Sequence, residues 1–240
     1  MNVNKNKLLY FDIETVSKYG SFKEMTETEF NIWLGYYEKT FLKKVTNPYR
    51  LEGLELHSDE HYEEVYQQTA SFFAEFGKVS CVSMAVTSTS SEGGLKYISY
   101  SGDDEKEILL NVRDVFDSSD KKGYHLCGQS IKFFDIPFLG KRFFMNGLKV
   151  PKIFPTHETK PWEIKVLDLR DVWSFNTKNS IGSLDVVCES LGITSPKNGD
   201  VKGDNVNFNY WTGNHDKIVE YCEKDVKALY DIVDFLTNLE

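Results

Sequence analysis

The chain has 240 residues and a formal net charge of −9 at pH 7. Its content of 40% hydrophobic and 14% aromatic residues is typical of a folded globular protein and argues against intrinsic disorder. The sequence has no secretory h-region and no apolar run long enough to cross a membrane, so we expect a cytoplasmic protein with no membrane partner. The four cysteines form no Cys-x-x-Cys pair, which predicts reduced core thiols at Cys81, Cys127, Cys188 and Cys222.

The acidic net charge argues against a nucleic-acid-binding protein, whose usual footprint is a basic surface. The charge is, however, unevenly distributed. Residues 121–202 carry 13 Lys and Arg against 8 Asp and Glu, a net charge of +5, whereas residues 1–120 carry 12 against 21 and residues 203–240 carry 3 against 8. The middle third therefore suits a polyanionic partner, and a solvated basic face without a partner is an equal alternative.

The first predicted strand, residues 8–15, is an apolar run that contains two acids, Asp12 and Glu14. Because side chains alternate along a strand, the two carboxylates lie on one face of a segment that is otherwise apolar enough to be buried. Two buried like charges repel each other, and a divalent cation beside them would remove the repulsion. The alternative is a strand end whose acids simply face water.

Residues 16–77 are predicted to form a helical insertion between the first and second strands. Apolar residues at three- and four-residue spacing predict one helix over residues 26–44 and a second that begins at Ser58. We interpret both apolar stripes as core, and the alternative is a flap or a partner-binding surface over the site.

The rest of the chain alternates strands and helices. Strands are predicted over residues 78–87, 95–100, 124–127 and 166–169. Helices are predicted over residues 105–116, after the turn at 128–130 as far as Phe143, over 184–191 and over 215–239. Ser183 is the predicted cap of the helix at 184–191, and a polar loop is predicted at 194–207. This order predicts an α/β layered domain with a mixed sheet.

Two later segments also carry acids in apolar surroundings. Asp135 lies within residues 133–139, and Tyr221 and Asp225 are four residues apart on the last helix, so they share one face. Three separate segments thus each present an acid, and convergence of this kind is what a metal site requires.

These three segments, in this order, resemble the exonuclease motifs of the DnaQ-like 3′–5′ exonucleases of RNase H-like fold. The spacing of Tyr221 and Asp225 is that of the DEDDy type, and the closest likeness is to stand-alone proteins related to the proofreading domain of family-B DNA polymerases. The histidine-type variant has its His where Glu220 stands here. Supporting matches lie at residues 76–79, at Asp168-Leu169-x-Asp171, at residues 183–185 and around Lys197.

The resemblance implies a single exonuclease domain over residues 1–240, built on a mixed five-stranded sheet flanked by helices, with the helical insertion at 16–77. It also implies two Mg²⁺ or Mn²⁺ ions, one held by Asp12, Glu14 and Asp225 and the other by Asp12 with Asp135, either directly or through a water. Tyr221 would orient or help to deprotonate the attacking water. The five catalytic residues implied are therefore Asp12, Glu14, Asp135, Tyr221 and Asp225.

The implied reaction is hydrolysis of the terminal phosphodiester bond of single-stranded DNA from its 3′ end, which releases nucleoside 5′-monophosphates. The implied substrate contacts are the backbone around Thr15, for the terminal 3′-hydroxyl, and Ser130. Phe134 and Phe133 are candidates to stack on terminal bases, and core packing is the alternative for one of the two. Lys141, Arg142, Lys149 and Lys152, in the basic middle third, are candidates for phosphate contacts, and solvated surface is the equal alternative for each. One residue departs from the pattern, because Gly128-Gln129-Ser130 stands where the family usually has Gly-x-Asn. This departure puts the positioning of the substrate in doubt.

Two alternatives stay open. An RNA exonuclease of the same fold would use the same residues, and a non-catalytic nucleic-acid-binding module would keep the fold without needing the acids. The length leaves no room for a polymerase domain, so we expect action in trans, with replication or repair proteins as possible partners. The sequence leaves the oligomeric state open.

Overall fold

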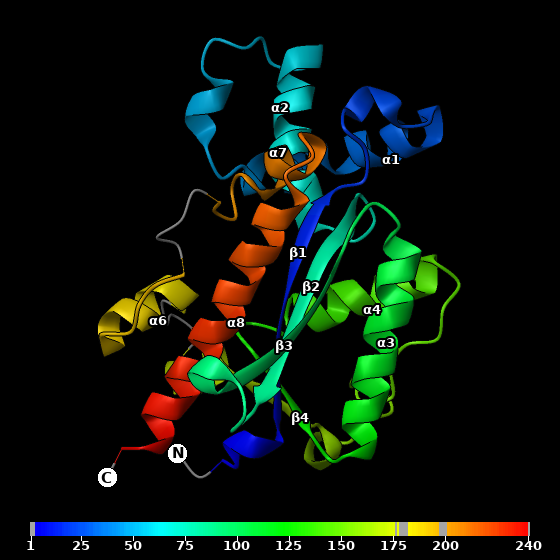
Figure 1. Ribbon diagram of the computed structural model, residues 1–240. Coiled ribbons are helices and arrows are strands. Elements are labelled where there is room, and N and C mark those ends of the chain that lie inside the picture. The colour runs from blue at the N-terminus through cyan, green and yellow to red at the C-terminus, as the bar shows by residue number, and fades with distance from the viewer. Residues whose placement is uncertain (1–2, 176, 178–181, 197–200, 240) are drawn as a thin grey trace.

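The computed structural model describes residues 3–175, 177, 182–196 and 201–239. A five-stranded sheet lies at its centre with the strand order β3-β2-β1-β4-β5 (Figure 1). The strand β2 is antiparallel to β1 and β3, whereas β4 and β5 run parallel to β1. The predicted mixed sheet is therefore confirmed, with strands β1 (Leu8–Ser17), β2 (Gly77–Thr87), β3 (Leu95–Ser101), β4 (His125–Gly128) and β5 (Val166–Asp168).

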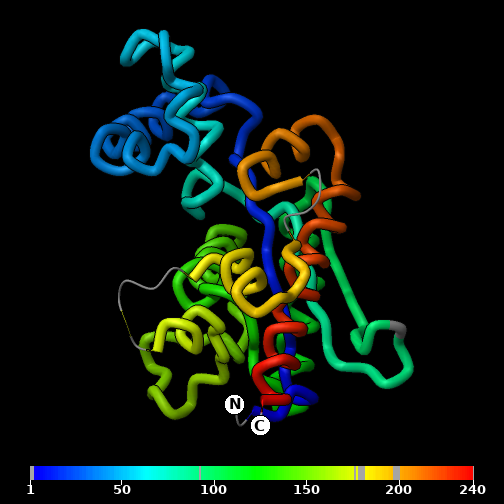
Figure 2. Tube along the Cα trace, turned by 90° about the vertical axis from the view of Figure 1, so that its left-hand side faces the viewer, coloured from blue at the N-terminus to red at the C-terminus, as the bar shows by residue number. Residues whose placement is uncertain are grey.

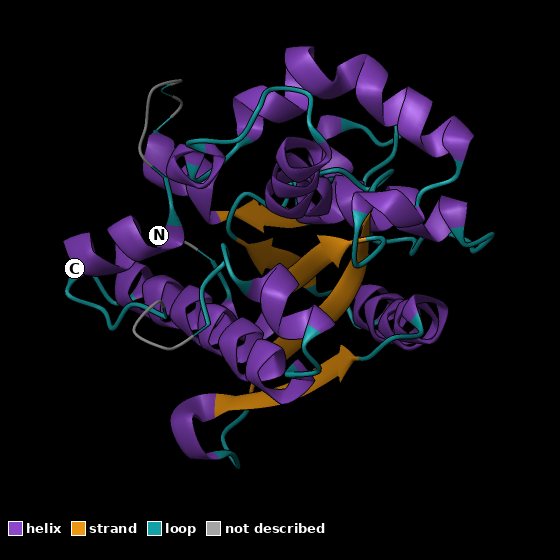
Figure 3. Ribbon diagram, turned by 90° about the horizontal axis from the view of Figure 1, so that it is seen from above, coloured by secondary structure: helices purple, strands orange, loops and turns teal. Residues whose placement is uncertain are grey.

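Helices cover both faces of this sheet, as the view from above shows (Figure 3). On one face, Leu9, Phe11 and Ile13 of β1 belong to the main hydrophobic core with α3 (Glu105–Lys121) and α4 (Asp135–Met145). On the other, Leu8 and Tyr10 pack with α6 (Leu184–Leu191) and α8 (His215–Thr237). The alternation of a strand thus assigns Asp12 and Glu14 to the face that α8 covers.

The predicted insertion forms a helical layer at one end of β1 and β2, and it stands away from the sheet in the side view (Figure 2). It contains α1 (Glu27–Tyr36) and α2 (Asp59–Thr69), and the helix predicted over 26–44 continues past α1 as a π-helical turn and a 3₁₀ turn. A separate hydrophobic cluster, with Trp33 and Tyr66 fully buried in it, holds the insertion together.

Two short helices were missed by the sequence prediction. The predicted strand at 166–169 ends at Asp168, whose side chain caps α5 (Leu169–Ser174). The predicted loop at 194–207 gives way to α7 (Val206–Trp211), an asparagine-rich helix of low intrinsic propensity. Tertiary contacts stabilise it, because Asn207 Oδ1 accepts a hydrogen bond of 2.8 Å from the Ser17 N–H, and Trp211 Nε1 donates one of 2.9 Å to Ser17 Oγ.

The remaining predicted helices are present with small changes at their ends. The helix α3 continues to Lys121 instead of ending at Phe116, and Asp104 caps its start by accepting a hydrogen bond from the Glu107 N–H. Ser183 occupies the cap position of α6, but its side chain makes no capping hydrogen bond. Within the described part of the chain, none of the helices combines the length and the apolar character that crossing a membrane would demand.

Candidate active site

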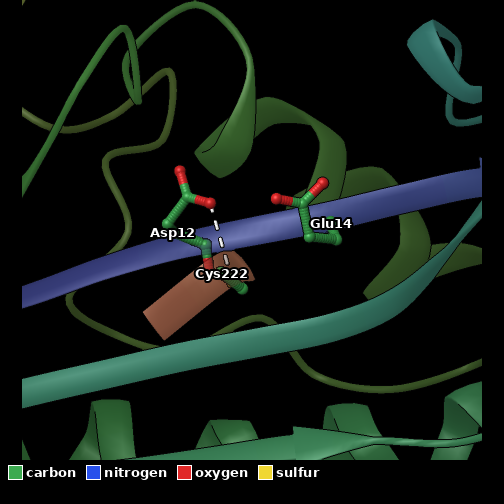
Figure 4. Close-up of side chains that lie close together, drawn as sticks. All are labelled: Asp12, Glu14 and Cys222. Atoms are coloured by element: carbon green, nitrogen blue, oxygen red, sulfur yellow. Dashed lines mark hydrogen bonds between the residues drawn. The ribbon is translucent and has the colours of Figure 1, made fainter. Parts of the chain in front are cut away.

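The two acids of β1 lie side by side on one face of the strand, and Cys222 of α8 approaches Asp12 (Figure 4). A β-bulge lies directly after this pair, where the pairing register of β1 with β2 shifts between Glu14 and Thr15. Ser80 is the extra residue on β2, and its hydroxyl donates a hydrogen bond of 3.0 Å to the Glu14 carbonyl, which keeps that oxygen satisfied. Bulges re-aim side chains next to active sites, and this one directly adjoins the acid pair.

The third acid, Asp135, is the first residue of α4 and is 3% exposed. Burial raises the pKa of its carboxyl group to about 7, and the negative charges of Asp168 and Asp225 add to this effect. A backbone hydrogen bond from Ile13 opposes the rise. The start of α4 is thereby placed against the acid-bearing part of β1.

The helix α8 contributes Tyr221, Cys222 and Asp225, all of them buried. Burial raises the pKa of the Tyr221 hydroxyl, and the nearby carboxylates of Asp225, Glu14 and Asp12 raise it further. The Cys222 thiol donates to the Asp12 carbonyl oxygen at 3.4 Å and to Asp12 Oδ2 at 3.6 Å. The predicted tyrosine and last acid therefore lie beside the acid pair of β1.

The four acids form one electrostatic unit, named the acid cluster below: Asp12, Glu14, Asp135 and Asp225. Burial raises the pKa values of Asp12 and Glu14 well above their usual range, and the negative charge of Asp225 is the next cause for both. Among the described residues, no Lys, Arg or His forms an ion pair with Asp12, Glu14 or Asp135. A buried excess of negative charge of this kind fits a bound cation.

The donor atoms suit a hard divalent cation. Carboxylate oxygens from Asp12 and Glu14 lie with the Cys222 sulfur within 4.8 Å of one another. Mg²⁺ and Mn²⁺ prefer such oxygen ligands, and the neighbouring acids Asp135 and Asp225 offer more of them. The residues present therefore fit the metal ions that the resemblance implies.

Sequence reasoning assigned no role to Asp168, which the structure shows to organise the turn before Asp135. Its carboxylate is 1% exposed and accepts three backbone hydrogen bonds, from the N–H groups of Ser130 (2.8 Å), Lys132 (2.9 Å) and Arg170 (3.0 Å). Ser130 has a φ of +61°, a left-handed conformation that Asn tolerates better than Ser. The available signal was an acid, a residue type that favours helix caps, at the end of a predicted strand.

Among the predicted substrate contacts, Thr15 and Phe134 are engaged within the protein. Thr15 Oγ1 donates a hydrogen bond of 2.8 Å to the Ser71 carbonyl. The Phe134 ring lies 5.5 Å from the Phe138 ring and packs against the main core. Phe133 instead is 66% exposed. Of the two neighbouring rings, it is therefore Phe133 that presents itself to solvent.

The two basic residues of α4 differ sharply. Lys141 is exposed and forms an ion pair of 2.8 Å with Glu75. Arg142 is 6% exposed, and its guanidinium binds both Glu105 carboxylate oxygens, at 2.8 and 2.5 Å, and the Ala74 carbonyl at 2.7 Å. A buried guanidinium with these partners cannot reach a phosphate, so we correct the assignment of Arg142 to the substrate contacts.

The other two basic candidates, Lys149 and Lys152, follow the end of α4. Lys152 donates its backbone N–H to Asp117 Oδ1 at 3.2 Å, beside α3. Lys197, which belongs to one of the supporting matches, lies outside the described residues.

Residues 71–233 match a family described as a predicted 3′–5′ exonuclease related to the exonuclease domain of PolB. The match covers more than half of the chain. The chain belongs to this family. The matched range includes Asp135, Tyr221 and Asp225, whereas Asp12 and Glu14 precede it. The predicted relationship to the proofreading domain of family-B polymerases is thus confirmed.

A solved structure of the family B DNA polymerase from the hyperthermophilic archaeon Pyrobaculum calidifontis resembles this protein with a TM-score of 0.56 and 15% sequence identity. The similarity covers 96% of this chain and 24% of the polymerase chain. It confirms the predicted RNase H-like fold. No curated protein matches the chain.

Proposed function

We propose that the protein is a metal-dependent 3′–5′ exonuclease of the DEDDy type, acting on single-stranded DNA and releasing nucleoside 5′-monophosphates. The acid cluster carries this proposal, because β1, α4 and α8 bring four carboxylates together in a buried setting that needs a cation. The family membership supports the reaction class. We take residues 1–240 as one exonuclease domain with 16–77 as its insertion, and replication or repair proteins as its partners.

In this proposal the four acids of the acid cluster bind two metal ions. Asp12, Glu14 and Asp225 hold one Mg²⁺ or Mn²⁺ ion, and Asp12 with Asp135 holds a second. When bound, such ions supply Lewis acidity toward the attacking water and the leaving 3′ oxygen. Their positive charge also offsets the mutual repulsion that raises the pKa values of these carboxyl groups.

Tyr221 positions the water in this proposal. Its raised pKa keeps the hydroxyl protonated at neutral pH, so the group donates or accepts a hydrogen bond and does not act as a free base. A side-chain hydrogen bond to Asp225 holds this hydroxyl beside the acid cluster. Of the two roles implied by the resemblance, orientation of the water is therefore the one we propose.

The substrate contacts in this proposal lie around the acid cluster. The backbone near Thr15 and the Ser130 hydroxyl contact the terminal nucleotide, and Phe134 supports it from the edge of the core. Lys141 contacts the phosphate backbone after release from Glu75, because an exposed ion pair of this kind contributes under about 1 kcal/mol. These contacts define one nucleotide-binding subsite next to the acids.

The proposal is tested with 5′-labelled single-stranded DNA and RNA of one sequence, incubated with Mg²⁺, Mn²⁺ or EDTA. We expect a ladder of DNA products shortened from the 3′ end, in the presence of metal only. Preferential shortening of RNA would support the RNA exonuclease instead, and no product from either would support the non-catalytic binding module. Tyr221→Phe is expected to lower kcat about 10- to 100-fold, as loss of one positioned hydrogen bond predicts.

A further inference from the structure

An exposed aromatic ring lies in the segment that leads to Asp135 of the acid cluster. Phe133 precedes Asp135 by two residues, and its ring is 66% exposed although large apolar side chains in this part of the chain are mostly buried. Its neighbour Phe134 packs inward against the main core. Nothing in the core thus requires an aromatic residue at position 133, and the ring is presented to solvent two residues before the buried Asp135.

A guanidinium group covers this ring. The Arg170 Cζ atom lies 5.6 Å from the centroid of the Phe133 ring, within the range of a cation–π contact. Arg170 is exposed, and it forms no ion pair with any other residue in the described ranges. Its charge is therefore available to a ligand, whereas the neighbouring Lys132 is paired with Asp171 at 2.7 Å.

The two side chains are held together by their backbones. The buried Asp168 carboxylate accepts hydrogen bonds from the Lys132 N–H and from the Arg170 N–H, so it joins the segment that carries Phe133 to the start of α5. The same carboxylate holds the Ser130 N–H in the turn that leads to Asp135. The backbone segments that carry the two side chains are thus held in place relative to the turn before Asp135, ahead of any ligand binding.

We propose that Phe133 and Arg170 form a base-stacking platform, the Phe133–Arg170 platform, which takes one unpaired nucleobase of single-stranded nucleic acid beside the terminal nucleotide. The proposal rests on the function proposed above. An aromatic face and a planar guanidinium stack on any base, and the guanidinium also attracts the phosphate backbone. A base inside a duplex is already stacked on both faces, so the platform selects a single strand.

Charge favours a nucleic acid over a protein as the occupant. The platform lies within residues 121–202, the segment of net charge +5 in a chain whose other parts are acidic. A second exposed pair, Lys160 with Trp162 at 5.5 Å, precedes β5 and so lies at the other end of this strand from Asp168. It has the same chemistry but no connection to the acid cluster, and it provides the matched control.

The kinetic test compares a single-stranded oligonucleotide with the p-nitrophenyl ester of thymidine 5′-monophosphate, which has no second base. For Phe133→Ala and Arg170→Gln, we expect the ratio of the oligonucleotide KM to the ester KM to rise about tenfold, as loss of one stacked base predicts. We expect the Phe133→Trp variant to keep the wild-type ratio, because tryptophan also stacks on a base, and Trp162→Ala to leave the ratio unchanged. An unchanged ratio in Phe133→Ala, or an equal rise in Trp162→Ala, would overturn the proposal.

A binding test separates the platform from the proposed function. We place 2-aminopurine at each of the last four positions of the single strand in turn and measure its fluorescence in Ca²⁺. Quenching at one position in the wild type, lost in Phe133→Ala and kept in Trp162→Ala, supports the platform even if neither substrate is cleaved. Absence of quenching at all four positions, or quenching that survives in Phe133→Ala, would contradict it.

Discussion

Two buried clusters of charged side chains lie on either side of the start of β2, and they are built in opposite ways. Glu105 and Arg142 form a closed network in which the carboxylate also accepts the Val79 N–H at 2.8 Å and the Asn146 amide at 3.0 Å. The acid cluster instead gathers carboxylates, and the described residues supply no ion pair to Asp12, Glu14 or Asp135. The first cluster is satisfied within the chain, whereas the second needs a charge from outside.

The difference separates a structural role from a functional one. The Glu105–Arg142 network joins α3, α4 and the start of β2, and Arg142 also holds the Ala74 carbonyl where the insertion returns to the sheet. It fixes the end of β2 that pairs with the acid-bearing part of β1. A buried ion pair of this kind thus supports a neighbouring cluster that opposes folding until a cation binds.

The largest expected effect is on activity. Asp12→Asn removes a carboxylate shared by both proposed metal ions, and we expect kcat/KM to fall about 1,000-fold or more, since several kcal/mol of transition-state stabilisation are lost. In EDTA the same variant should be at least as stable as the wild type, because the repulsion within the acid cluster is reduced. Nucleotide release and urea unfolding measure the two quantities. Asp231→Asn, which breaks a partly exposed ion pair of α8, is the control, and a similar loss of activity there would contradict this account.

The next effect is on stability, in the paired network. Arg142→Met leaves Glu105 buried without its cation, and we expect the free energy of unfolding to fall by about 3–5 kcal/mol. Lys141→Met removes the adjacent but exposed ion pair with Glu75 and should change it by under about 1 kcal/mol. Urea denaturation of both variants measures the contrast. Equal losses would show that the network has no special structural role.

The acid cluster should also make stability depend on pH in the metal-free protein. The folded-state pKa of Asp135 is about 7, above its usual 3.8, so the folded protein holds the proton more tightly than the unfolded chain does. The stability that this proton contributes is present at pH 4 and is lost as the pH rises to 7, by about 2–4 kcal/mol. Urea unfolding in EDTA across this range tests the sign. Asp135→Asn should flatten the dependence, and stability that instead rises with pH in the wild type would contradict the prediction.

The smallest effect concerns the turn that carries Asp135. Ser130 has a φ of +61°, so Ser130→Asn should stabilise the protein by about 0.5 kcal/mol, because Asn adopts the left-handed conformation more readily. Ser130→Val should destabilise it by about 1 kcal/mol or more, because a β-branched residue is strained there. Thermal unfolding resolves both shifts. The same sign for Asn and Val would show that backbone strain is not the cause.

Local patterns were enough to predict most elements and the two shared faces. Strand alternation placed Asp12 and Glu14 together, and helical spacing did the same for Tyr221 and Asp225. Their convergence with Asp135 came from the family resemblance, because no local pattern reports which distant segments meet. The helix α7 was missed for the same reason, because contacts with distant residues stabilise it. Its Asn207 side chain accepts a hydrogen bond from Ser17, and the Lys78 ammonium lies 4.5 Å and 4.8 Å from the ring centroids of Tyr210 and Trp211.

The assignment of Arg142 failed although the sequence held a usable signal. Arg142 follows Phe138 by four residues and Leu139 by three, and both of these lie on the buried face of α4. Lys141 is one step of the helix away and points outward. A prediction from charge alone gives the two residues the same role, whereas their positions on the helix predict that one is buried and the other exposed. The inward arginine pairs with a buried acid on another helix, Glu105. A local sequence pattern does not identify such a partner on a distant segment.

The central claim is that the acid cluster binds divalent cations, and diffraction tests it most directly. Crystals soaked in Mn²⁺ and a nucleoside 5′-monophosphate should show two anomalous peaks about 4 Å apart, held by Asp12, Glu14, Asp135 and Asp225. The phosphate of the nucleotide should contact both ions. Crystals whose lattice leaves these carboxylates accessible, and which bind no Mn²⁺ among them, would contradict the claim and favour a non-catalytic binding module.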